Sequence, residues 1–204
     1  MTTPAIEILM SEHRVIEQVL SSLEAFVRSL DEGATEVRSR IGEYAEFFCE
    51  FADHCHHGKE EDRLFTALTR HGFPADGGPV AVMLHEHEAG RCHVRALAEI
   101  GAGTGPLSLE DRQQVRLHSL EFVSLLRQHI MKEDEILFPA AERALPAETL
   151  AALAEDFERH EREEMGDGTH ERLHQLADKL IASQETKVAA NHQLHADDAP
   201  PCTH

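Results

Sequence analysis

The 204-residue chain has a formal net charge of −19 with histidine counted as neutral, no tryptophan and 5% aromatic residues. This charge makes nucleic acid and anionic membrane surfaces poor partners, and no apolar run approaches the roughly 20 residues of a membrane span. The four cysteines form no CxxC pair and no secretory signal is visible, so we expect a cytoplasmic protein with free thiols.

Helix-favouring residues and helical periodicity predict six helices, separated by segments rich in glycine and proline. Their expected bounds are 4–30, 35–72, 79–100, 108–138, 146–165 and 170–185. Thr3 and Pro4 are a start signal for the first helix, and the box of Ser108 and Asp111 is one for the fourth, which Pro139 ends or kinks. Residues 187–204 have no apolar period and are expected to be disordered.

One pattern occurs in both halves of the chain: a lone histidine, then a His-xxx-Glu segment followed by Leu-Phe. The lone histidines are His13 and His87, and the segments begin at His56 and His129 and end at Glu60 and Glu133. Residues four apart lie one above the other on a helix face, which lets an imidazole and a carboxylate bind one metal centre. Two such helical hairpins predict a four-helix bundle with a two-metal site on its pseudo-twofold axis.

Helical phase selects which histidines point inward. At about 100° per residue, each candidate histidine shares a helix face with apolar side chains. The second helix is ambiguous, because both His56 and His57 have a glutamate four residues later. Its apolar face is centred nearer His56, so we choose His56 with Glu60. His57 and Glu61 are then assigned to a helix boundary or to an outer shell.

Six side chains would meet at one level of the bundle, and their chemistry predicts bound metal. They are His13, His56, Glu60, His87, His129 and Glu133. Any one of the histidines alone could be a core histidine with its hydrogen bonds satisfied, but buried carboxylates without a counter-charge cost several kcal/mol each. No lysine is in phase, Arg91 would neutralise only one carboxylate, and two divalent cations would neutralise both. Mixed imidazole and carboxylate donors favour iron or manganese, and the absence of inward cysteines argues against structural zinc.

Two further features of the sequence could also bind metal. Glu17, one turn after His13, is a candidate seventh ligand or a hydrogen-bond partner of one. The segment from His170 to His174 matches the HExxH motif of zinc peptidases, with Glu171 in the place of the base. That chemistry needs a third protein ligand, and the only downstream histidines lie in the segment expected to be disordered. A charged amphipathic helix is therefore the preferred interpretation.

The motifs SEHRVIE, HHGKEEDRLF, MLHEHEAGR and HIMKEDEILFP occur in this order. With them, about residues 3 to 140 resemble the hemerythrin-like family, also called the HHE cation-binding domain. The resemblance implies an up-down four-helix bundle that holds two iron ions in a non-haem, oxo- or hydroxo-bridged centre. It also implies that the six side chains named above are the ligands and that Glu60 and Glu133 bridge the metals.

The chain departs from the oxygen carriers of that family at two positions. Arg91 stands where they carry a second histidine on the third helix, and Glu133 stands where they end a His-xxxx-Asp motif. One iron would then have fewer nitrogen ligands and a more open shell, which disfavours reversible oxygen carriage. Members similar to this chain at these positions imply peroxide decomposition instead. Arg91 would be catalytic there, because a fixed guanidinium stabilises a peroxide anion.

The sequence thus predicts an all-α protein in three parts. Residues 1–145 form the hemerythrin-like four-helix bundle, residues 146–186 a C-terminal extension of two shorter helices, and residues 187–204 a disordered tail. The leading function is a catalase-like reaction of a di-iron centre with peroxide or oxygen. The alternative is a non-enzymatic protein that binds, senses or stores oxygen, nitric oxide or iron. The expected partner is a small molecule, and no nucleic acid or membrane is expected to bind.

Overall fold

The structure, a computed structural model, describes residues 2–30, 36–166 and 168–196, the last thirteen by backbone only. Within these residues it is all-helical, which confirms the predicted fold class. The α-helices are α1 (Pro4–Arg28), α2 (Val37–Phe47), α3 (Phe65–Arg70), α4 (Gly78–Gly101), α5 (Leu109–Lys132), α6 (Phe138–Ala144), α7 (Ala147–His160) and α8 (Thr169–Ala196). Four π-helical segments interrupt them: η1 (Phe48–His57), η2 (Glu60–Leu64), η3 (Glu133–Leu137) and η4 (Glu161–Met165).

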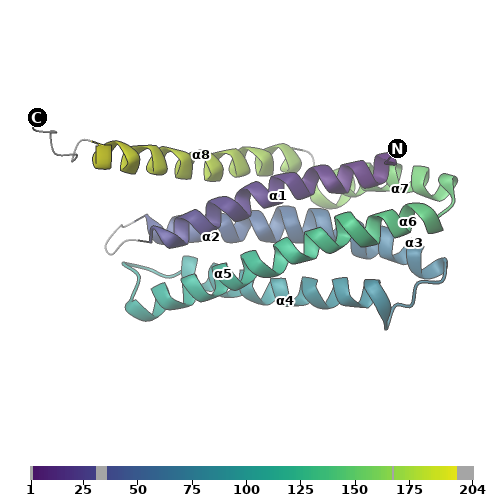
Figure 1. Ribbon diagram of the computed structural model, residues 1–204, viewed down its shortest axis with the longest axis horizontal. Coiled ribbons are helices and arrows are strands. Elements are labelled where there is room, and N and C mark those ends of the chain that lie inside the picture. The colour runs from purple at the N-terminus through teal and green to yellow at the C-terminus, as the bar shows by residue number, and fades with distance from the viewer. Residues whose placement is uncertain (1, 31–35, 167, 197–204) are drawn as a thin grey trace, which may run out of the picture.

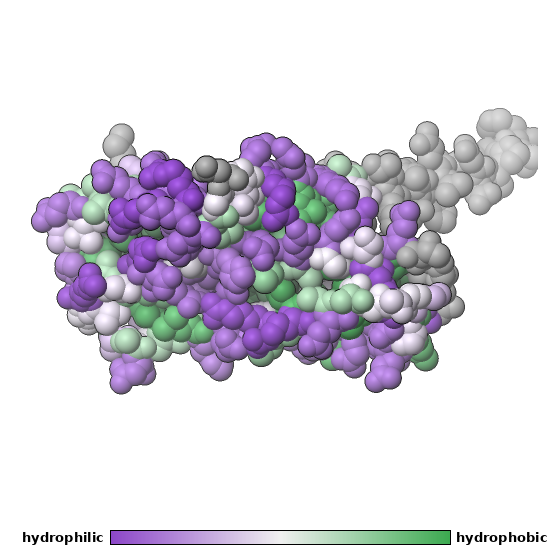
Figure 2. All heavy atoms as spheres, turned by 180° about the vertical axis from the view of Figure 1, so that it is seen from behind, coloured by the Kyte–Doolittle hydropathy of each residue, from purple (hydrophilic) through white to green (hydrophobic). Residues whose placement is uncertain are grey.

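Helix α1, the run from α2 to α3, helix α4, and the run from α5 to α6 lie side by side along the long axis of the molecule (Figure 1). α4 packs against both α2 and α5, and α1 packs against α5. α7 and α8 pack on α1, and α8 also contacts α2. None of the described helices combines the length and the apolar character that crossing a membrane requires. The face seen in Figure 2 is covered mainly by hydrophilic side chains, as the charge of the chain leads one to expect.

The apolar core forms two clusters, one on each side of the level at which the candidate ligands lie. On α1, Leu9 belongs to one cluster and Ile16 to the other, and His13 lies between them in the chain. The same division separates Leu126 from Leu137 along the run of α5 and η3. The polar level is thus enclosed by packed hydrocarbon at both ends.

Two helix ends differ from the sequence prediction. Pro139 does not end the fourth helix, because it occupies the first turn of α6, where a missing N–H is tolerated, and the helical run continues to Ala144. The last helix extends to Ala196, past residue 187, where the sequence predicts the start of a disordered tail. Alanine favours helix strongly even where no apolar period is present. Residues 197–204 lie outside the described part of the chain.

Candidate metal centre

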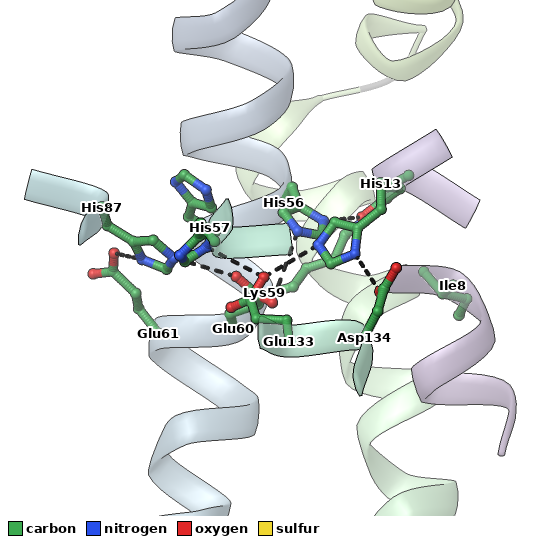
Figure 3. Close-up of polar contacts among 12 residues, drawn as sticks. Ile8, His13, His56, His57, Lys59, Glu60, Glu61, His87, Glu133 and Asp134 are labelled. Atoms are coloured by element: carbon green, nitrogen blue, oxygen red, sulfur yellow. Dashed lines mark hydrogen bonds and ion pairs between the residues drawn. The ribbon is translucent and has the colours of Figure 1, made fainter. Parts of the chain in front are cut away.

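The structure brings the six predicted ligands together in the interior. They come from α1, from the run of η1 and η2, from α4, and from the run of α5 and η3. Each is at most 1% exposed: His13, His56, Glu60, His87, His129 and Glu133. Figure 3 shows the two glutamates at the centre, with imidazoles on either side of them.

Each central carboxylate lies between two histidines. One oxygen of Glu133, Oε2, lies 3.2 Å from Nε2 of His13 and 3.2 Å from Nε2 of His129. The oxygens of Glu60 lie 3.7 Å from Nε2 of His56 and 3.5 Å from Nε2 of His87. In each pair one histidine is four residues earlier on the same helical run and the other comes from a different helix. The His-xxx-Glu spacing therefore has the effect predicted for it.

Several of these atoms are buried without a hydrogen-bond partner. Both oxygens of Glu60, both oxygens of Glu133, and Nε2 of His13 and of His56 are in this state. A buried polar atom without a partner costs about 1 to 3 kcal/mol, and more when it is charged. So many in one place fit a site built for cations, because metal coordination would satisfy all of them.

The charges of the two carboxylates conflict. Burial and the nearby negative charge of Glu133 raise the pKa of Glu60 well above its ordinary value. Burial also acts on Glu133, but the nearby imidazoles of His129 and His13 outweigh it and lower the pKa of Glu133. Two carboxylates this close are not both ionised unless positive charge lies beside them. A pair of divalent cations would supply that charge.

His57 also belongs to the centre, which the helical phase did not predict. It is 6% exposed, and its ring stacks on that of His87 with centroids 3.7 Å apart. Its ligand atom and those of Glu60, His87 and His129 all lie within 4.8 Å of one another, as do those of His13, His56, Glu60 and Glu133. Glu60 belongs to both groups, so it lies where it could bridge two ions.

Local helix geometry explains why His57 faces inward together with His56. The phase analysis assumed α-helical periodicity, but both neighbours lie in η1, whose hydrogen bonds run from i to i+5 and give a wider turn. In a wider turn each residue advances by a smaller angle, so His56 and His57 both project inward. A π-helical segment also begins at each central glutamate, η2 at Glu60 and η3 at Glu133.

A second layer of carboxylates surrounds the histidines, one at each Nδ1 atom. The pairs are His13 with Asp134 (2.8 Å), His56 with Glu12 (2.9 Å), His57 with Asp53 (3.5 Å), His87 with Glu61 (2.7 Å) and His129 with Glu86 (3.0 Å). An ionised carboxylate only accepts, so Nδ1 of His13, His56, His87 and His129 donates to its carboxylate partner. Nδ1 of His57 lies 3.5 Å from Asp53 without a hydrogen bond. The Nε2 atoms of the four donating histidines face the central carboxylates, and those of His87 and His129 lie 3.0 Å apart. This is the arrangement that orients histidine ligands in metalloproteins.

A third layer supplies cations to these outer carboxylates. The pairs are Arg14 with Asp134, Lys59 with Glu12, Lys132 with Glu86, and Arg91 with both Asp53 and Glu61. Burial raises the pKa of Glu12, but the hydrogen bond to His56 and the charge of Lys59 outweigh it and lower the pKa to about 2. Burial likewise raises the pKa of Asp53, but the contacts with His57 and Arg91 outweigh it and lower the pKa to about 2.

The layers repeat between the two halves of the chain. Residues of α1 correspond to residues of α4, and residues of the second helical run correspond to residues of the fourth. The matching pairs are His13 and His87, His56 and His129, Glu60 and Glu133, Glu12 and Glu86, Glu61 and Asp134, and Lys59 and Lys132. Their contacts match as well, since Glu12 contacts His56 as Glu86 contacts His129. The internal repeat seen in the sequence therefore extends to the outer layers.

Two of the other candidates lie away from the centre. The guanidinium of Arg91 contacts the outer carboxylates Asp53 and Glu61 and the exposed Glu88, and not Glu60 or Glu133. The side chain of Glu17 is 37% exposed and pairs with Arg14 at 3.1 Å, so it is not a ligand in this arrangement.

Of the HExxH segment, His170 alone joins a group of possible metal ligands among the described residues, together with Glu12, Cys55 and Glu161. His170 and His174 pack beside the ring of Phe51, and Glu171 accepts a hydrogen bond from Gln175 on the surface. His170 approaches Glu12, where the ammonium of Lys59 already lies. The preferred interpretation of this segment, a packed amphipathic helix, agrees with these contacts.

Comparisons with known proteins agree with the geometry. The family model described as the hemerythrin HHE cation binding domain matches residues 5–141. Among curated proteins, Uncharacterized protein Mb2018 of Mycobacterium bovis and Uncharacterized protein Rv1995 of Mycobacterium tuberculosis are each 23% identical over 173 residues. That match covers 81% of this chain and 67% of each relative. No solved structure gives a significant match.

Proposed function

Because the chain belongs to the hemerythrin HHE cation-binding domain family, we propose that its buried cluster holds two iron ions and reacts with peroxide. The observation that supports this most directly is the set of buried, unpartnered carboxylate oxygens and imidazole nitrogens at one level of the molecule. We also propose that α1, the run from α2 to α3, α4, and the run from α5 to α6 form the up-down four-helix bundle of the family, residues 1–145, with residues 146–186 as an extension.

In this proposal the two groups of donors each hold one ion. The first position takes His57, His87 and His129, the second takes His13 and His56, and Glu60 and Glu133 lie between them. Two iron ions, when bound, would supply Lewis acidity and one-electron redox chemistry at adjacent positions. The ligand set is one imidazole larger than the six residues predicted from sequence.

The residues of the chain itself orient donors, hold protons and exclude water. The outer carboxylates of His13, His56, His87 and His129 keep a proton on Nδ1, so the Nε2 atoms of these histidines would be available to the metals. The two apolar clusters close both ends of the polar level. A cavity of about 220 Å³ reaches the rings of His57 and His87 from outside, and Phe48, Val94 and Phe122 line it, so oxygen or peroxide has room to approach.

The reaction proposed is the disproportionation of two molecules of hydrogen peroxide into two of water and one of oxygen. Peroxide is both oxidant and reductant in it, so its atoms and electrons balance without another donor. Reversible oxygen binding is the second candidate. His57 supports it, because a fifth imidazole removes the shortage of nitrogen ligands that the sequence alone indicated at the position of Arg91.

The test combines metal analysis with kinetics. We expect about two irons per chain and a ferric optical band from bridged iron. We also expect oxygen release on adding peroxide, and loss of most iron and of oxygen release in Glu60→Ala and Glu133→Ala. A long-lived band formed from the reduced protein and oxygen, removed by deoxygenation and accompanied by no peroxide turnover, would favour the binding function. A full metal complement in the double alanine variant would contradict the site itself.

A further inference from the structure

The repeat between the two halves fails at three positions whose side chains contact one another. His57 corresponds to Ile130, Asp53 to Leu126, and Arg91 to Glu17. Ile130 and Leu126 are buried apolar residues and Glu17 lies at the surface, so the second half has no equivalent of this set. The asymmetry is therefore concentrated in one connected group of side chains beside one of the two proposed metal positions.

Arg91 joins the outer partners of two neighbouring histidines. Its Nε atom lies 2.9 and 3.1 Å from the two oxygens of Asp53, and its Nη2 atom lies 2.5 Å from Oε1 of Glu61. Asp53 contacts His57, and Oε1 of Glu61 lies 2.7 Å from Nδ1 of His87. One planar guanidinium thus holds the carboxylates behind two imidazoles that stack on each other.

We propose that Arg91 is a positioning residue that assembles only one of the two metal positions, the one built from His57, His87 and His129. It acts through Asp53 and Glu61. In the other half Arg14 contacts Asp134, the counterpart of Glu61, but among the contacts of the described residues no cation there joins two outer carboxylates, so the two metal positions are inequivalent. This inference rests on the proposed two-metal function and replaces the catalytic role that the sequence suggested for Arg91.

The geometry gives Arg91 a task that a lysine would perform poorly. Two stacked rings must present their Nε2 atoms to one ion, so both carboxylates behind them need fixed directions. A rigid guanidinium fork fixes directions, whereas an ammonium is a point charge on a flexible stem. Removing an outer partner of a metal-binding histidine typically weakens metal binding by about 10- to 100-fold.

The other position has a different anchor. Lys59 is fully buried and contacts Glu12 behind His56, and it also lies 2.5 Å from Glu161 in η4, which precedes the last helix. Arg91, by contrast, is 27% exposed and borders the cavity that reaches His57. Changing Arg91 and changing Lys59 should therefore affect different metal ions.

The experiment is an anaerobic titration of the metal-free protein with Fe²⁺, followed by calorimetry and by iron content after gel filtration. The wild type should show two binding steps. Arg91→Met should weaken one step by about 10- to 100-fold and leave about one iron per chain after filtration. If the fixed direction of the guanidinium matters, the affinity of this step in Arg91→Lys should lie between that of the wild type and that of Arg91→Met. Arg95→Gln is the matched control on the same helix face, because Arg95 is exposed and contacts only Glu88 and Cys92 among the described residues.

Double variants identify which position is lost. In a His57→Ile background, which copies the residue of the other half, Arg91→Met should cause no further loss of iron. In a His56→Ala background it should remove the iron that remains. Lys59→Met should instead cause no further loss of iron in the His56→Ala background and should remove the remaining iron in the His57→Ile background. Helix content by circular dichroism, measured on every variant, reports whether the fold is kept.

The outcomes separate the two proposals. A wild type that binds fewer than two irons would contradict the proposed function. A wild type that binds two, with both steps unchanged in Arg91→Met, would overturn the role of Arg91 alone. Equal weakening of both steps in a folded variant would also overturn it, because the inference assigns Arg91 to one position. Should Arg91→Met fail to fold, Arg91→Lys, which keeps the charge, decides the question by the same criteria.

Discussion

Four of the outer carboxylates are chain neighbours of a proposed ligand, yet each serves a ligand on another helix. Glu12 precedes His13 and contacts His56, and Glu86 precedes His87 and contacts His129. Two consecutive residues of one helix thus supply a proposed metal ligand and a carboxylate that accepts a hydrogen bond from a ligand histidine of another helix. The centre and its support are therefore specified by the same short motifs.

The variant His57→Ala would show whether four or five imidazoles bind the metals. We expect His57→Ala and His56→Ala to lose similar amounts of iron, each falling to about one ion per chain, because each residue belongs to one of the two donor groups. Metal analysis after gel filtration measures this. Iron retained in full by His57→Ala would return that residue to the outer layer, where the helical phase had placed it.

The HExxH letters should have no metal role. Glu171→Gln is expected to leave iron content and peroxide turnover at the wild-type level, since Glu171 lies on the surface and contacts Gln175. Iron and zinc analysis, with an oxygen electrode for turnover, would check this. The interpretation fails if the protein carries one zinc per chain that disappears in His170→Ala.

The sequence singled out the residues that the structure brings together in the interior, but not the carboxylates that surround them. His13 and Glu133 could be found because a buried polar side chain on an apolar face breaks a strong pattern. The partners Glu12 and Asp134 were not identified, because acidic residues at helix surfaces are common in a chain with 38 of them. A usable signal was present all the same, since the pairs Glu12–His13 and Glu86–His87 recur at matching positions of the two halves.

At the scale of elements, the π-helical segments contain several of the proposed ligands and are the feature that the sequence analysis did not anticipate. η1, η2 and η3 lie where ligands are supplied, and such widened turns are frequent at functional sites. Helical phase counted at about 100° per residue does not reveal them, because that count assumes α-helical turns throughout. The bounds of α1 and α4 were predicted closely, since each begins with a proline start signal and has no widened turn.

Gly58 permits the C-terminal helices to pack close to the centre. It lies between η1 and η2, and a Cβ atom there would come within 2.9 Å of the ring of His160 on α7. Its backbone is helical, so the small side chain serves this close approach rather than an unusual conformation. We expect Gly58→Ala to destabilise the protein by about 1 to 3 kcal/mol through overpacking. Chemical denaturation measures this.

The matched control for that variant is Gly42→Ala, because a Cβ atom at Gly42 meets nothing within 4 Å. Replacing a helical glycine by alanine where there is space should stabilise the fold by about 0.5 to 1 kcal/mol. Opposite signs at the two positions would support the contact between Gly58 and His160. If Gly58→Ala were as stable as Gly42→Ala, the packing of α7 described here would be wrong.

At the scale of the whole molecule, the proposed centre divides the hydrophobic core instead of lying at its edge. Seven donor side chains, with their outer carboxylates, occupy a level that apolar residues could otherwise have filled. A buried polar level of this kind is stable only when its charges are paired, and breaking such pairing costs about 3 to 5 kcal/mol. Metal occupancy should therefore be coupled to the stability of both core clusters at once.

Removing metal is thus expected to lower the melting temperature of the entire protein in one transition. Ligand that binds only the folded state at about 1,000 times its dissociation constant stabilises by about 4 kcal/mol. In a protein of this size 1 kcal/mol shifts the midpoint by about 2 to 4 °C, so the shift should be roughly 10 °C. Scanning calorimetry before and after anaerobic chelation would measure it, and Fe²⁺ should restore the midpoint.

The Glu60→Ala, Glu133→Ala double variant should melt at one temperature with or without Fe²⁺, because it lacks the carboxylates that join the two positions. Equal midpoints for the iron-loaded and chelated wild-type protein would mean that the metals are not coupled to the core, and the arrangement of two clusters around one polar level would then need another source of stability.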